Sequence, residues 1–171
     1  HDRQFDPNGV DFFPLTCFDG AIGDKFTVNG KIQPFMPVKQ RKYRFRMLAM
    51  GPSRTYNWFL SNGKPFVMIG VDGNLLPAPV IVQNFQHTTA ERFDIVMDFS
   101  QYAPGTEIVL LNRAEQVNGR GPTGKLLNPG FEVLKFIVTS SATQVVDNSR
   151  IPAALRPLPT IEQPVANSRT W

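Results

Sequence analysis

The chain has 171 residues, 42% of them apolar, so it is long enough for one domain with a hydrophobic core and too apolar for wholesale disorder. Its net charge is +4, and Lys and Arg are spread along the sequence, which is typical of an ordinary solvated surface. No run approaches the roughly 18 apolar residues of a membrane helix, so no membrane partner is predicted. Frequent Phe, Pro and Gly, together with Val, Ile and Thr, indicate short strands joined by turns.

The clearest predicted strands are 41–48 and 92–99, in which apolar and charged residues alternate. A period of two places Tyr43, Phe45 and Met47 on one face and the cations on the other. Further strands are predicted at 25–28, 55–60, 66–71, 80–86, 107–112 and 132–139.

Turn signals separate these strands. Asn29-Gly30 and Asn62-Gly63 are dipeptides favoured in two-residue hairpins, because both positions need a positive φ. Asp72-Gly73 and Pro104-Gly105 mark further turns. Strands spaced about ten residues apart predict an all-β antiparallel sandwich or barrel.

Three segments lack strand periodicity. Residues 118–130 are rich in Gly, Asn and Pro and are predicted to form a long loop. The first 13 residues and the proline-rich segment 147–167 are expected to be irregular. Because both ends resemble linkers, we expect an excised middle piece of a longer protein.

Metal-binding and catalytic residues are sparse. A copper site for electron transfer takes two His and one Cys at close quarters, and a catalytic zinc site takes three ligands. The chain has only His1, His87 and Cys17 of these types, and Cys17 has no neighbouring His. We expect His87 to be a half-exposed turn residue. Cys17 is interpreted as a small buried hydrophobe or the partner of a cysteine outside this chain. No catalytic residue and no metal ligand is assigned.

Other chemistries find no better support. The sequence has no Gly-x-Ser-x-Gly elbow and no phosphate-binding glycine loop. Asp94 and Asp98 share the polar face of a strand with Arg92, so local ion pairing explains them. The strand 41–46 sends aromatics and cations to opposite faces, whereas base stacking needs them on one exposed face. No nucleic-acid partner is therefore predicted.

Several ordered motifs resemble one family. Val28-Asn29-Gly30-Lys31 and the later run Arg41–Arg46 are similar to the "VNGK" and "RKYRFR" signatures of multicopper oxidases. Ile69–Leu76 and Ala90–Phe99 are similar to the "IGxDGGLL" and "AERxDxxxDF" signatures. The resemblance covers roughly residues 1–140 and is strongest to the bacterial laccase, spore-coat-protein-A and bilirubin-oxidase-like branch.

The resemblance implies a fold and a role. In that family three cupredoxin-like domains follow one another, and the coppers lie in the third domain and between the first and third. The second domain is copper-free, bridges its neighbours and helps to wall the substrate pocket. The resemblance thus implies a cupredoxin-like Greek-key β-sandwich or barrel whose partners are the first and third domains. It places a lead-in segment at 1–16, the domain at 17–142 and a linker at 143–171.

The parent enzyme would carry copper, oxidise phenolic or similar substrates and reduce dioxygen to water, while the isolated segment is expected to be inactive. The resemblance also implies an extracytoplasmic parent, secreted or part of a spore coat. By position in the motifs, Ser53 and Thr55 would approach the substrate, as would the loop residues Val117, Asn118 and Gly119. Ordinary turn hydroxyls are the alternative for the first two. Related laccases join a cysteine near the "VNGK" strand to one in this loop. Here Cys17 is displaced and the loop has no cysteine, so that disulfide is expected to be absent.

A second hypothesis is a stand-alone β-sandwich that binds a partner and has no catalytic activity. His-x-His motifs before the segment and a His-Cys-His run after it would favour the enzyme. In isolation, uncovered apolar strand faces are expected to cause self-association.

Overall fold

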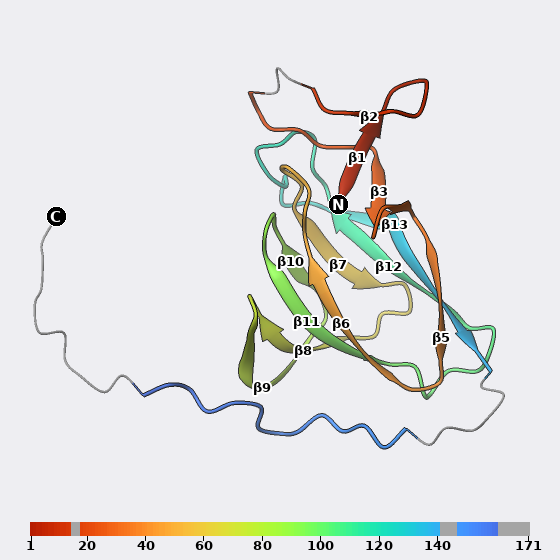
Figure 1. The fold of residues 1–171 in the computed structure, drawn as a ribbon, viewed down its shortest axis with the longest axis vertical. Helices are drawn as coiled ribbons and strands as arrows, with labels where there is room; N and C mark the ends of the chain where they lie inside the picture. The colour runs from red at the N-terminus through yellow and green to blue at the C-terminus, as the bar shows by residue number, and fades with distance from the viewer. Residues whose placement is uncertain (15–17, 141–146, 161–171) are drawn as a thin grey trace, which may run out of the picture.

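The structure is a computed structural model that describes residues 1–14, 18–140 and 147–160. Two large sheets face each other, and a small sheet lies at one end (Figure 1). The strands of the described residues are β1 (Asp2–Phe5), β2 (Asp11–Phe12), β3 (Lys25–Val28), β4 (Lys31–Ile32), β5 (Phe35–Lys39), β6 (Lys42–Leu48), β7 (Tyr56–Leu60), β8 (Phe66–Val71), β9 (Asn74–Val82), β10 (Phe85–His87), β11 (Arg92–Asp98), β12 (Glu107–Ala114) and β13 (Leu126–Thr139).

The sheets have the orders β10-β7-β12-β13-β5, β6-β11-β8-β9 and β2-β1-β3-β4. Their pairs are antiparallel, except that β5 runs parallel to β13. The predicted all-β sandwich is confirmed. Among the described residues, no helix has the length and apolarity needed to cross a bilayer.

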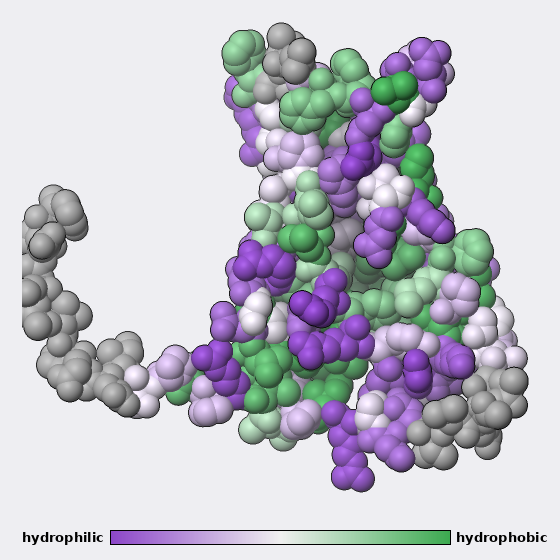
Figure 2. Space-filling view, viewed as in Figure 1, coloured by the Kyte–Doolittle hydropathy of each residue, from purple (hydrophilic) through white to green (hydrophobic). Residues whose placement is uncertain are grey.

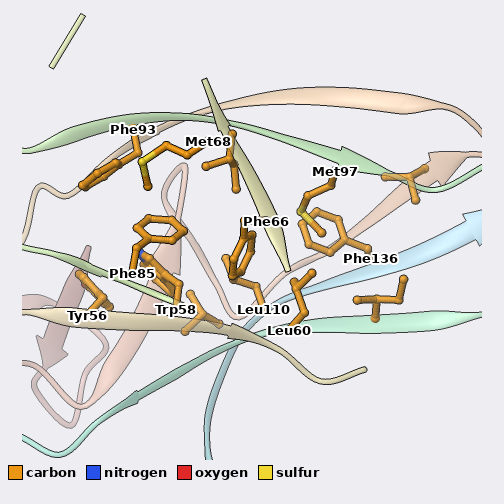
Figure 3. Packing of buried hydrophobic residues seen from close by; sticks show 14 of the residues in the cluster. Tyr56, Trp58, Leu60, Phe66, Met68, Phe85, Phe93, Met97, Leu110 and Phe136 are labelled. Atoms are coloured by element: carbon orange, nitrogen blue, oxygen red, sulfur yellow. The ribbon is translucent and has the colours of Figure 1, made fainter. Parts of the chain in front are cut away.

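Aromatic and aliphatic side chains fill the space between the two large sheets (Figure 3). Tyr56 and Trp58 of β7 stack with ring centroids 4.6 Å apart. Met68, Phe93 and Met97 approach from the facing sheet. Full burial of one such side chain contributes about 1.5–3 kcal/mol, so this layer provides the main driving force for folding.

The predicted alternation along β6 and β11 is confirmed. The two strands pair in register, with Phe45 opposite Ile95, and their inward residues pack on the core. Their outward residues form the ion pairs Lys42–Asp98 and Arg44–Asp94. Local pairing therefore accounts for these charges.

One of the two predicted hairpins forms, and the turn predicted at Asp72-Gly73 is also a hairpin. Asn29-Gly30 joins β3 to β4, Asp72-Gly73 joins β8 to β9, and all four residues have positive φ. The Asn62-Gly63 hairpin prediction is wrong, because the strands on either side, β7 and β8, belong to different sheets. This turn crosses from one layer of the sandwich to the other.

The irregular ends were predicted too broadly. The first 13 residues contain β1 and β2, which pair with each other, and β1 also pairs with β3. β5 was not predicted. The loop 118–130 is shorter than expected, because β13 already begins at Leu126.

Residues 147–160 form no strand and run along the end of the molecule away from β1 and β2 (Figure 1). The Lys42 N–H donates to Asp147 Oδ2 at 2.7 Å, and the Leu155 N–H donates to the Pro77 carbonyl at 2.8 Å. Because β6 and β9 are the two edges of one sheet, this segment spans that sheet from edge to edge.

Candidate functional site

The predicted pocket residues lie where three backbone segments meet, and we call 19–20, 53–55 and 116–120 together the loop wall. A Cβ built on Gly119 would overlap the backbone of Asp19 and Gly20, and one built on Gly20 would overlap the Ser53 side chain. Only residues without a side chain allow this approach. The structure thus brings the predicted Ser53 and Gly119 close together. It also adds the segment 19–20, which the sequence did not indicate.

The Gln116 side chain connects two sides of the loop wall. Its Nε2 donates to the carbonyls of Ser53 and Asn118, both at 2.8 Å. Its Oε1 accepts from the Thr55 N–H at 2.9 Å. Sequence reasoning missed Gln116, and its only signal is a polar residue that follows a strand and enters a loop.

The five predicted pocket residues differ in exposure. Val117 is 72% exposed, whereas Ser53, Asn118 and Gly119 are half-buried. Thr55 is only 7% exposed and contributes its backbone N–H to the loop wall. Val117 is therefore the most exposed of the five predicted residues.

A buried ion pair joins the segment 53–55 of the loop wall to β1. Arg54 Nε donates to Asp2 Oδ2 at 2.8 Å, and the exposed fractions of the two side chains are 6% and 0%. Arg54 Nη2 also donates to the Gly23 carbonyl at 2.6 Å, and the Gly23 N–H donates to Asp2 Oδ2 at 2.6 Å. The pair fastens β1 to the turn that carries Ser53 and Thr55. Charge pattern in the sequence gave no indication of it.

A hollow of ≈270 Å³ opens beside this pair, between the β1–β2 hairpin and the segments 21–23 and 50–52. Its lining includes Asp2, Phe12 and Met50 but none of the five predicted pocket residues. The predicted residues therefore lie on a neighbouring surface rather than inside this hollow.

The prediction for His87 is wrong, because the side chain is only 1% exposed. Trp58 Nε1–H donates to its Nδ1 at 3.1 Å, so Nε2 carries the proton and donates to the Glu91 carbonyl at 2.8 Å. The Ala49 N–H lies 3.1 Å from Nε2 and 3.3 Å from the Glu91 oxygen. Since Nε2 is already protonated, the Ala49 N–H donates to that oxygen instead. Burial lowers the pKa of His87, so the imidazole is neutral.

The described residues do not fit a copper site. Among residues 1–14, 18–140 and 147–160, no group of three His, Cys, Asp or Glu side chains could hold a metal ion. Both ring nitrogens of His87 are occupied, and His1 Nδ1 lies 3.0 Å from the Met50 carbonyl. Cys17 lies outside the described residues. No step that passes through copper is therefore assigned to this chain.

Comparison with known proteins places these observations in a family. No model of a protein family matches the sequence. A laccase of Bacillus subtilis is 39% identical over 99% of this chain, and a bilirubin oxidase of Albifimbria verrucaria is 36% identical over 92% of it. The chain spans 34% and 28% of the lengths of these curated relatives.

Solved structures give the same relationship. A variant of the McoA multicopper oxidase from Aquifex aeolicus superimposes with a TM-score of 0.77 and 30% identity, covering 94% of this chain and 34% of that one. A laccase from Pediococcus acidilactici has a TM-score of 0.73 and 29% identity, covering 95% and 31%. The chain belongs to the multicopper oxidase family, of which it forms a cupredoxin-like domain.

Proposed function

We propose that the chain is the second, copper-free domain of a laccase-like multicopper oxidase. The observation that carries the proposal is a match over 99% of this chain to only 34% of a laccase, as expected for one domain of three. The order of the motifs supports the middle position, and the proposed lead-in at 1–16 and linker at 143–171 agree with it.

The domain would act as a scaffold between the first and third domains. Docking between domains needs apolar surface, and exposed apolar side chains gather at the β1–β2 end (Figure 2). Phe12 of β2 and the adjacent Phe13 are both exposed there. These side chains support the proposal that a neighbouring domain covers this end in the intact protein, and that the isolated chain self-associates.

The domain would also supply part of the substrate pocket through its loop wall. Ser53, Asn118 and Gly119 lie together, and the side chain of the neighbouring Val117 is exposed to solvent. An exposed aliphatic side chain next to half-buried amides offers an apolar contact for an aromatic ring and polar groups for a hydroxyl. This combination fits a phenolic substrate.

The intact oxidase would take one electron from each of four phenol molecules and pass four electrons and four protons to dioxygen, which gives two waters. The copper centres that carry these electrons would belong to the other domains. This chain would hold the substrate and keep the copper-bearing domains in place.

Substitution of Val117 in the intact, copper-loaded oxidase tests the pocket. Val117→Arg should raise the KM for 2,6-dimethoxyphenol several-fold and leave the copper content per chain unchanged. Val80→Arg, on the exposed strand β9, is the matched control and should leave the KM unchanged. An unaltered KM in Val117→Arg would show that the loop wall is not part of the substrate pocket.

The copper-free role has a separate test. Copper added to the isolated chain should produce no intense blue absorption band. Such a band would contradict the assignment, whereas flanking His-x-His and His-Cys-His sequences in the gene would support the enzyme over a stand-alone binding module.

A further inference from the structure

We propose that Gln116 is a positioning residue whose carboxamide holds the loop 117–121 at a fixed separation from the turn 53–55. The consequence for substrate rests on the proposed function, in which these two segments form part of the pocket. The positioning role itself rests only on the hydrogen bonds that Gln116 makes within this chain.

A single side chain makes all three of these bonds. Gln116 Oε1 accepts from the Thr55 N–H, and Nε2 donates to the carbonyls of Ser53 and Asn118, at 2.8–2.9 Å. Ser53 and Thr55 lie more than 60 residues before Gln116 in the sequence. The carboxamide therefore joins segments that the chain connects only over a long distance.

The chemistry of the three partners calls for a carboxamide. They comprise one donor and two acceptors, and an amide offers one acceptor oxygen and two N–H donors. A carboxylate of the same length would accept from Thr55 but would face two carbonyl oxygens without a proton to give. A methionine of similar length would satisfy none of the three.

Other contacts hold the base and the tip of the loop but do not join it to the turn 53–55 by hydrogen bonds. The base is closed by the Glu115 N–H to the Lys125 carbonyl at 3.1 Å and by the Thr123 N–H to the Glu115 carbonyl at 2.9 Å. Nearer the tip, Arg120 Nε donates to Asp19 Oδ1 at 2.7 Å, but the Arg120 side chain is 75% exposed. Such a solvated pair contributes little to stability. Gly119 packs on Gly20 without a side chain of its own.

Loss of the carboxamide should therefore loosen both segments together. Each of the three hydrogen bonds contributes to holding the two segments together. We expect amide exchange to become about tenfold faster in Gln116→Met, both in 117–121 and in 53–55. A wider loop wall would hold a phenol less well, so the KM should rise and kcat should change little.

The experiment uses the intact oxidase that contains this chain. Hydrogen exchange read by mass spectrometry reports the two segments without any need for turnover. Gln116→Met, Gln116→Glu and the control Gln101→Met, at an exposed glutamine, are compared with the unaltered protein. Kinetics are measured with 2,6-dimethoxyphenol and with hexacyanoferrate(II), a small donor that needs no aromatic contact.

Gln116→Glu separates positioning from general damage to the fold. At neutral pH its carboxylate lacks both donors, and protonation at lower pH restores one of them. Its exchange, normalised to the unaltered protein at each pH, should therefore approach the normal rate as the pH falls. If Gln116→Met does not accumulate as folded protein, the pH series on Gln116→Glu tests the positioning role by itself.

Unchanged exchange of both segments in Gln116→Met and Gln116→Glu would overturn the proposal. Faster exchange with a raised KM for 2,6-dimethoxyphenol alone would support it together with the pocket. Faster exchange with both KM values unaltered would support the positioning role and overturn the pocket assignment, so the two proposals fail separately.

Discussion

Two of the buried polar clusters in the described part of the chain, one at His87 and one at Asp2–Arg54, satisfy their polar atoms in different ways. At His87 the polar atoms are neutral and paired, because Trp58 and the Glu91 carbonyl occupy both ring nitrogens. At Asp2–Arg54 the groups are charged, and among the described residues Asp2 Oδ1 and the Tyr56 hydroxyl find no hydrogen-bond partner. Burial, followed by the charge of Asp2, raises the pKa of Tyr56, so its phenol stays protonated. At His87 both ring nitrogens are therefore satisfied internally, whereas the buried Asp2 carboxylate has Arg54 as its counter-ion and the Gly23 N–H as a second donor to the same oxygen.

Breaking the charged cluster should have the largest effect. Arg54→Met leaves the fully buried Asp2 carboxylate unpaired and detaches the turn from Gly23. We expect a loss of about 3–5 kcal/mol in the free energy of unfolding, measured by urea denaturation. The double variant Asp2→Asn, Arg54→Met should regain part of that loss, because no charge is then buried alone. A loss below 1 kcal/mol in the single variant would show that water already solvates the pair.

Breaking the neutral cluster should have a smaller effect. His87→Phe keeps an aromatic ring against Phe93 and Phe85 but leaves Trp58 Nε1–H without an acceptor. We expect a loss of about 1–3 kcal/mol, the usual cost of a buried unsatisfied polar group. Near-UV circular dichroism should also change at Trp58. Unaltered stability and spectrum would mean that packing, rather than the hydrogen bonds, determines this site.

The pH dependence of stability should report on the neutral cluster at His87. Burial is the main cause of the lowered pKa of His87, and the nearby carboxylates of Glu91 and Asp72 oppose it. Below the ordinary value of 6.5, the unfolded chain therefore binds a proton that the folded chain does not. The contribution of His87 is complete above that pH and is lost as the pH falls from 6.5 towards the lowered pKa. The slope is at most about 1.4 kcal/mol per pH unit, and the stability difference between the unaltered protein and His87→Phe should shrink across this window.

Breaking an exposed ion pair should have the smallest effect on stability. It serves as the reference for the buried pair Asp2–Arg54. The Arg92 and Asp72 side chains lie 3.3 Å apart and are both about half exposed. Arg92→Gln should change the free energy of unfolding by about 0–1 kcal/mol, and 0.5 M salt should reduce that change. A larger, salt-resistant effect would show that exposure does not explain the difference between this pair and Asp2–Arg54.

The sequence predicts the strands whose pattern repeats locally. β6 and β11 alternate with a period of two, and β3 and β8 have the bounds that were predicted. β5 was missed because its partner β13 is about 100 residues away and Pro37 interrupts its strand signal. The Asn62-Gly63 turn was misassigned for a similar reason, because the dipeptide favours a tight turn but does not specify which sheet follows it.

The candidate site was predictable only through its motifs. Ser53, Thr55 and 117–119 were placed by resemblance, and the structure brings their backbones together. Gln116 and the segment 19–20 could not be found from the sequence, because their contacts depend on backbone carbonyls and bare glycines rather than on residue pattern. His87 was predicted to be half-exposed because a strand end usually faces solvent, whereas here Trp58 and Phe93 enclose it.

The parallel β5–β13 pair also determines when this domain can finish folding on the ribosome. β5 is synthesised early, yet its partner is complete only at Thr139, about 100 residues later. At about 5–20 residues per second, that delay is on the order of ten seconds. During it β5 is an unpaired strand that carries the exposed Phe35, and such edges recruit other chains. The nascent domain therefore passes through a period in which β5 is open to chaperones and to other chains, and slower translation before Thr139 would lengthen that period.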